Sequence, residues 1–200
     1  MEVSYFSSGG YTMRYVLFVC CILLCAVSVE AREIAGVSVP ETMPGEKGAV
    51  LTLNGAGMRS KLFFKIYIAQ LYLEKPANEA AEVLAADGQK KMIMHFLYEK
   101  VSKEQLVEAW NEGFNGNLDE HEKVALAPRI NQFNEMFATV GKGDTILLAY
   151  VPESGTKVVV AGKEKGIVPG KDFSDALLSI WLGEKPITPD LKKALLNFGK

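Results

Sequence analysis

Apolar residues recur along the chain in two patterns, and the first predicts the strands of a sheet. In residues 61–74 each even position from Leu62 to Ile68 is apolar, whereas the odd positions mix lysine, tyrosine and apolar residues. Such alternation predicts a strand with one face on a core and a mixed second face. The segment Asn54–Gly57 is expected to form a turn before it. Further strands are predicted over residues 34–39, 49–53, 91–98, 145–151, 157–161 and 166–168.

The second pattern has the spacing of helices. Ser102 and Gln105 are placed as the capping box that begins a helix. The residues that follow place apolar side chains four apart on one face: Leu106, Trp110 and Phe114. Further helices are predicted over residues 77–86, 119–140 and 173–181 and from Thr188 onward, with Pro128 marking a start or a kink in the second.

The order of these elements is strands, helices, strands and helices. It predicts an α+β fold in which helices pack on one face of a largely antiparallel sheet. The chain has 200 residues, of which 48% are hydrophobic, and this composition excludes a disordered chain. Residues 32–200 show no repeat and no long linker, so we expect one domain there.

The first 31 residues have the pattern of a secretory signal peptide. Arg14 precedes an apolar run over residues 15–29, and cleavage is expected after Ala31. The run is shorter than the roughly 20 residues of a membrane span, although an uncleaved anchor stays an alternative and Met13 an alternative start. All three cysteines lie in this segment. The mature protein is therefore expected to be exported and to contain no thiol.

Composition and motifs exclude several kinds of site. The net charge is -2 and no basic stripe occurs, so a nucleic-acid partner is not expected. The two histidines, His95 and His121, have no partner at metal-ligand spacing, so neither a metal nor another cofactor is expected. No G-x-S-x-G motif indicates a serine nucleophile.

Arg59 and Tyr67 are the candidate ligand-binding residues. Arg59 follows the glycine-rich segment, and Tyr67 lies eight residues further on. One interpretation is that Arg59 is a surface arginine paired with an acid. The other is that its guanidinium lies at the end of an apolar cleft, where it would give two charge-assisted hydrogen bonds to one carboxylate or phenolate. The hydroxyl of Tyr67 would add a third.

Three motifs in this order resemble the chalcone isomerase family. They are the segment Leu53–Arg59, the segment Leu71–Glu74 (LYLE), and Gly183-Glu184 followed by Thr188–Lys192 (TPDLK). The resemblance runs from about residue 34 to the end and is best to bacterial, signal-bearing members. It implies an open-faced β-sandwich, in which a layer of helices covers a large antiparallel sheet with the ligand cleft between them. It also implies a periplasmic location in a Gram-negative bacterium.

The same resemblance bears on catalysis. Arg59 matches the arginine that steers the substrate oxyanion in the plant isomerases, and Tyr67 stands at their strand threonine. Leu106, Gly113 and Ile180 stand at their tyrosine, asparagine and last threonine. Most polar catalytic groups are thus replaced, and an enzymatic role is not favoured. The arginine–tyrosine pair resembles instead the non-catalytic, fatty-acid-binding branch, in which it holds a carboxylate.

Three functions stay open. The first is binding of a fatty acid or similar small amphipathic carboxylate by Arg59 and Tyr67, in a cleft to which Leu106, Trp110 and Ile180 contribute. The second is an isomerase, or intramolecular lyase, acting on a small ketone, although no general base is evident. The third is a cell-envelope interaction protein whose cleft is filled or whose arginine is paired with an acid. Contact with a membrane is expected only through the signal peptide.

Overall fold

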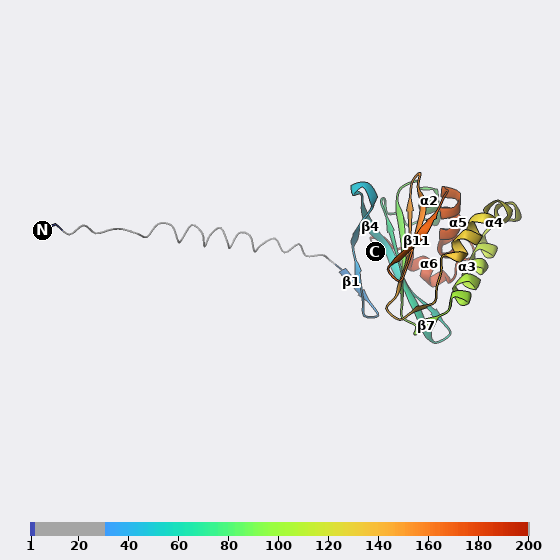
Figure 1. Cartoon of the computed structure of the whole chain (residues 1–200), viewed down its shortest axis with the longest axis horizontal. Coiled ribbons are helices and arrows are strands. Elements are labelled where there is room, and N and C mark those ends of the chain that lie inside the picture. Colours follow the sequence, from blue (N-terminus) through green and yellow to red (C-terminus); the bar gives the residue numbers. More distant parts are fainter. Residues whose placement is uncertain (3–30, 200) are drawn as a thin grey trace. The chain divides into compact units, whose positions relative to one another are not determined.

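An antiparallel sheet of seven strands forms the centre of the structure, a computed structural model that describes residues 1–2 and 31–199 (Figure 1). In sheet order its strands are β11 (Lys163–Val168), β10 (Gly155–Val160), β9 (Thr145–Val151), β6 (Lys90–Phe96), β5 (Phe64–Leu73), β4 (Val50–Lys61) and β3 (Thr42–Pro44). Two short ribbons lie outside it: β1 (Ala31–Ile34) with β2 (Val37–Pro40), and β7 (Lys100–Val101) with β8 (Val140–Gly141). The expected signal peptide, apart from its ends, and the three cysteines lie outside the described residues.

Helices cover one face of this sheet, on the right in Figure 1. The α+β prediction is therefore confirmed. Ser102 caps α3 through the predicted capping box with Gln105, and Thr188 caps α6. None of the described helices is long and apolar enough to cross a membrane. The helices are α2 (Ala80–Ala85), α3 (Lys103–Asn117), α4 (Glu120–Glu135), α5 (Lys171–Leu182) and α6 (Pro189–Leu195), and a 3-10 turn, η1 (Glu46–Gly48), precedes β4.

Apolar side chains form one cluster on each face of the sheet. Tyr67 and Leu71 of β5 belong to the larger cluster, between sheet and helices. Ile68 and Tyr72 of the same strand pack on the opposite face with Val39 of β2. The strand is thus buried on both faces over most of its length. This explains why its odd and even positions are both apolar, and it corrects the prediction of a mixed second face.

The segment Asn54–Gly57 is not a turn, in contrast to the prediction. It lies inside β4, and the chain reverses instead at Leu62 and Phe63, between β4 and β5. The even positions at this reversal are exposed, so the apolar alternation there did not mark a core face. The glycines have another cause, because they lie beneath α6.

Two further boundaries differ from the predictions. Residues 34–39 belong to a hairpin, in which β1 and β2 pair across Ala35 and Gly36. The helix predicted over 119–140 ends at Glu135, and Pro128 lies inside it. Phe137 and Val140 are nevertheless buried, because the chain beyond the helix continues along the same core.

Candidate functional site

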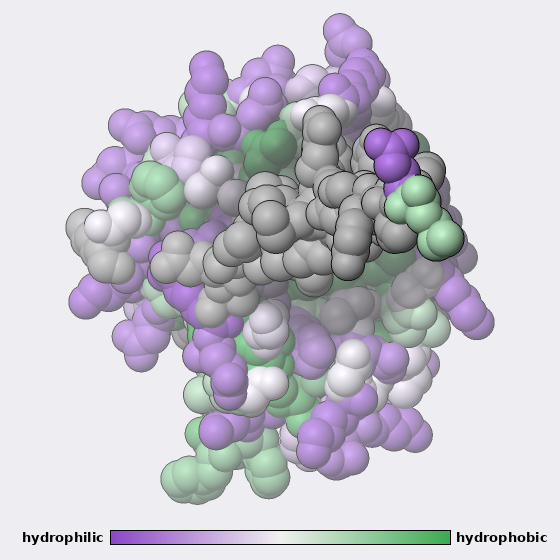
Figure 2. Space-filling view, turned by 90° about the vertical axis from the view of Figure 1, so that its left-hand side faces the viewer, coloured by the Kyte–Doolittle hydropathy of each residue, from purple (hydrophilic) through white to green (hydrophobic). Residues whose placement is uncertain are grey.

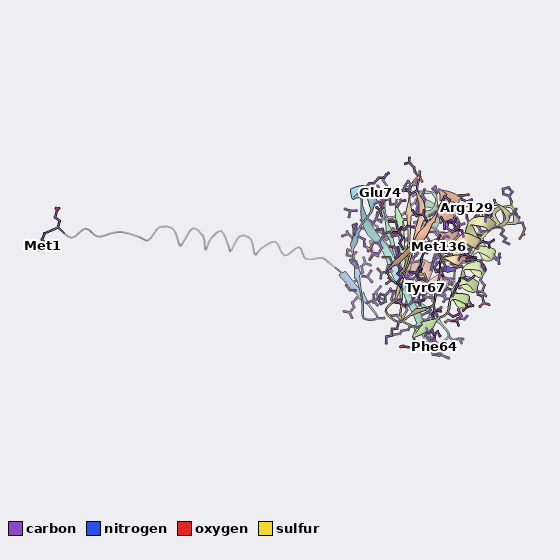
Figure 3. The ribbon with its side chains drawn as sticks, viewed as in Figure 1. Met1, Phe64, Tyr67, Glu74, Arg129 and Met136 are labelled. Carbon is purple, nitrogen blue, oxygen red and sulfur yellow. The ribbon has the colours of Figure 1, made fainter. Side chains whose placement is uncertain are left out.

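A cavity of about 320 Å³ lies between the β4–β5 hairpin and helix α3. Arg59 pairs with Tyr67 across the hairpin, so both side chains leave the sheet on the same face. Figure 3 shows Tyr67 within the body of the domain and Phe64 at its lower end. The cavity is lined by Arg59, Lys61, Leu62, Phe64, Ile66, Tyr67, Met94, Phe96, Tyr98, Lys100, Val101, Gln105, Leu106, Glu108, Ala109, Trp110, Glu112 and Ile187.

A β-bulge at Asn54 turns Arg59 toward the helices. Leu53 pairs with Tyr72 and Gly55 with Leu71, so Asn54 is an extra residue in β4. Before the bulge the odd positions of β4 join the cluster on the far face, and after it they face the helices. Asn54 is held by its own amide, which donates to Leu195 O at 2.8 Å and accepts from Ala77 N at 2.8 Å.

The two glycines that precede Arg59 allow helix α6 to lie directly on β4. A Cβ atom on Gly55 would collide with the backbone oxygens of Ala194 and Leu195. A Cβ atom on Gly57 would lie 2.6 Å from the Cβ atom of Ala194. The glycine pattern therefore serves close packing beside the site and not a turn.

Tyr67 is a buried residue whose hydroxyl has not used its capacity to donate a hydrogen bond. Its Oη accepts a hydrogen bond from Trp181 Nε1 at 3.1 Å, and its own O–H has no acceptor among the described residues. Burial raises the pKa of Tyr67 to about 12, and the positive charge of Arg59 and the Trp181 hydrogen bond oppose that rise. Tyr67 is thus a neutral donor at physiological pH.

Two further donors at the cavity have no partner. Arg59 Nε and Trp110 Nε1 are buried atoms without a hydrogen bond to any described residue. The guanidinium of Arg59 lies 5.7 Å from the centre of the Tyr67 ring, a cation–π contact. Arg59 forms no ion pair with an acid in residues 31–199. The three residues that carry these donors and the positive charge therefore line one cavity, which suits an anionic group.

Comparison with known proteins places this geometry in a family. The model of the chalcone isomerase-like family matches residues 31–197. The chain belongs to the chalcone isomerase-like family. The crystal structure of a fatty-acid binding protein of Arabidopsis thaliana has the same fold, with a TM-score of 0.66 and 19% sequence identity over 84% of this chain and 96% of that one. A search of curated sequences found no match.

Two of the three residues expected at the cleft of this chalcone isomerase-like domain line the cavity. Leu106 and Trp110 reach it from α3. Ile180 of α5 is fully buried and lies against Gly113 of α3, away from the lining. The sequence predicts Trp110 only as a residue that lines the cleft, and it does not reveal that the indole N–H has no partner. Helical spacing reports only that a tryptophan faces the core, not which polar neighbours it meets there.

The mouth of the cavity has two differently charged rims. Lys61 and Lys100 lie on the strand side, whereas Glu108 and Glu112 lie on α3, and all four are exposed. No histidine lines the cavity. Across residues 31–199, no group of three histidine, cysteine, aspartate or glutamate side chains is placed to hold a metal ion. The site therefore combines buried hydrogen-bond donors with exposed charged side chains at its mouth.

Proposed function

We propose that this protein is a non-catalytic binder of a small amphipathic carboxylate such as a fatty acid. The observation that carries the proposal is the buried, unpartnered Nε of Arg59, beside the free hydroxyl of Tyr67 in one cavity. A buried donor without an acceptor costs about 1–3 kcal/mol. A ligand carboxylate would satisfy these donors.

The carboxylate would be bound by charge-assisted hydrogen bonds. A guanidinium can donate two parallel bonds to a carboxylate, which are about twice as strong as neutral ones. Tyr67 stays protonated because of its raised pKa, so it can donate to the same anion. The indole N–H of Trp110 offers a further donor.

The alkyl part would lie on the apolar wall of the cavity. Met94 and Phe96 of β6 contribute to this wall from the sheet, and Leu106 contributes from α3. A volume of about 320 Å³ is at the lower end of the range for small-molecule sites. We therefore infer a small ligand with one anionic group and a compact or short apolar tail.

Two observations support this proposal over a ligand-free envelope protein. The cavity is open, and Arg59 is without an acidic partner among the described residues. The Arabidopsis protein of the same fold is a fatty-acid binding protein. We propose in addition that the domain acts after export, as the signal-like pattern of residues 1–31 suggests.

Native mass spectrometry of residues 31–200 tests the proposal. The wild-type domain should retain a small bound acid that Arg59→Ala lacks. Added fatty acid at 100 times its dissociation constant should raise the free energy of unfolding of the wild type by about 2.7 kcal/mol. An empty wild-type domain whose stability does not respond to added acids would refute the proposal.

A further inference from the structure

The tip of the β4–β5 hairpin, residues 61–65, exposes three consecutive apolar side chains. Leu62 is 85% exposed, Phe63 98% and Phe64 54%. Figure 2 shows apolar side chains that project from the lower end of the domain, the end at which Figure 3 labels Phe64. Single exposed apolar residues are common, but a run of them at a projecting tip marks an interaction site.

The turn itself is built from unusual residues. Leu62 has a φ of 55°, in the left-handed region that leucine seldom adopts. A two-residue hairpin turn is ordinarily made by Asn-Gly or a similar pair, which would be soluble and unstrained. This chain has Leu-Phe instead, so the folding of the hairpin does not explain the choice.

Positive charges surround the apolar tip. Lys61 and Lys65 flank it, and Lys100 lies beside it on the wall of the cavity. None of these lysines forms an ion pair with another described residue. Tyr98 packs edge-on against Phe64, with ring centres 5.5 Å apart. The exposed apolar side chains would suit the hydrocarbon region of a bilayer. The tyrosine would suit the interface, and the unpaired lysines would suit the anionic headgroups.

We propose that the hairpin tip docks on an anionic lipid surface and thereby places the mouth of the cleft against the bilayer. Lys61, Leu62 and Phe64 belong both to the tip and to the lining of the cavity. An acid could then pass between bilayer and cleft without crossing water. This transfer role rests on the proposed function, whereas docking itself does not.

Charge determines the orientation of docking. The chain has a net charge of -2, so an anionic surface repels it as a whole. Glu108 and Glu112 line the same mouth from α3, so the lysine rim would lie nearer to the lipid than the α3 rim. From the sequence, membrane contact is expected only through the signal peptide, and residues 62–64 are predicted as part of a strand with one face on a core.

Vesicle co-sedimentation of residues 31–200, the compact unit with every described helix and strand, tests the proposal. The vesicles contain phosphatidylglycerol and phosphatidylcholine in equal parts, or phosphatidylcholine alone. We expect the wild-type domain to bind the anionic vesicles. Phe63→Ser should weaken binding about tenfold, and the double variant Lys61→Gln/Lys65→Gln by about fivefold for each lysine.

Matched controls lie at the other end of the same two strands. Val50→Ser changes an exposed apolar residue at the start of β4, and Lys47→Gln/Lys75→Gln removes two exposed lysines beyond the strand ends. These variants should bind vesicles as the wild type does. Equal losses in tip and control variants, or no binding by the wild type, would overturn the proposal.

Two further readouts separate this proposal from others. The affinity of Phe63→Ser for a soluble short-chain acid, measured without vesicles, should equal that of the wild type. Vesicle binding without any acid binding would leave docking intact and refute the proposed function instead.

Gel filtration of the domain should show a monomer. A dimer that Phe63→Ser dissociates would assign the tip to a second copy of the chain and overturn the membrane proposal.

Discussion

Two cations on this sheet are each placed over a tyrosine ring, yet they have opposite surroundings. Lys90 Nζ lies 5.6 Å from the ring centre of Tyr150, and the Arg59 guanidinium lies 5.7 Å from that of Tyr67. Lys90 Nζ donates to Leu84 O at 3.2 Å and Asp175 Oδ1 at 3.4 Å. Arg59 Nε donates to no described residue.

The spaces beside the two cations differ in the same sense. The space beside Lys90 is about 10 Å³, at the lower limit of what one water needs, whereas the cavity that Arg59 lines has about 320 Å³. A cation whose donors are filled by the chain serves the fold. A cation with a free donor at an open cavity can serve a ligand. Their charge and their contact with a tyrosine ring alone would not distinguish them.

Removing the Arg59 guanidinium should have the largest effect. Arg59→Met should weaken the binding of a fatty acid at least a hundredfold, because two charge-assisted hydrogen bonds of about 1.5–3 kcal/mol each are lost. Its free energy of unfolding should stay within about 1 kcal/mol of the wild type, since no described partner is left unpaired. Titration calorimetry and urea unfolding measure the two quantities.

Arg129→Met is the control for this variant. The guanidinium of Arg129 already has an acidic partner, because it donates two hydrogen bonds of 2.6 Å to the carboxylate of Asp172. The loss of this exposed pair should leave ligand affinity unchanged. If both arginine variants bind the acid equally well, Arg59 does not hold the carboxylate.

Lys90→Ala should show the reverse pattern. The side chain is 2% exposed and donates two hydrogen bonds, so truncation leaves a void and removes those bonds, and we expect a loss of about 2–4 kcal/mol in the free energy of unfolding. Ligand affinity should not change. Lys91→Ala, on the opposite face of the same strand, should cost less than about 1 kcal/mol. Similar losses at both positions would show that Lys90 is not a structural cation.

The sequence predicted elements whose signals are local. The capping box of Ser102 and Gln105, the hairpin around residues 152–155 and the Thr188 cap need only neighbouring residues, and each is present. The family motifs led to Arg59 and Tyr67, which the structure places opposite each other.

The features that were missed depend on residues far apart in the chain. Asn54 forms a bulge because its amide bonds to Leu195, and the glycines beside it accommodate α6. Lys90 is buried because Asp175 approaches it from α5. No local pattern separates a glycine in a turn from a glycine beneath a helix, or an exposed Leu-Phe-Phe from a buried one.

Alkaline pH should test the state of Tyr67. Its pKa is about 12 in the folded protein against about 10 in an unfolded chain, so the unfolded state loses this proton first. The neutral hydroxyl therefore makes its full contribution to the free energy of unfolding below pH 10. That contribution is lost as the pH rises toward 12, by up to about 2–3 kcal/mol.

The difference in stability between wild type and Tyr67→Phe isolates this effect, because Tyr72 and Tyr150 titrate in both proteins and cancel. At pH 8 the variant should be less stable by about 1 kcal/mol, since Trp181 loses its acceptor. The wild type's advantage in denaturation by urea should shrink above pH 10 and reverse as the pH approaches 12, because the expected loss exceeds about 1 kcal/mol. A difference that stays constant with pH would mean that the hydroxyl is not desolvated.

The smallest expected effect is that of replacing one of two tryptophans. Like the two cations, one tryptophan has its donor bonded within the chain and the other does not. The rings of Trp110 and Trp181 lie 5.7 Å apart, and the indole N–H of Trp181 is bonded to Tyr67 whereas that of Trp110 is free. Trp110→Phe should weaken acid binding about fivefold to tenfold, the value of one hydrogen bond. Trp181→Phe should instead lower the free energy of unfolding more than Trp110→Phe does, because it also leaves Tyr67 without its donor. If Trp110→Phe binds the acid as the wild type does, the carboxylate is held by Arg59 and Tyr67 alone.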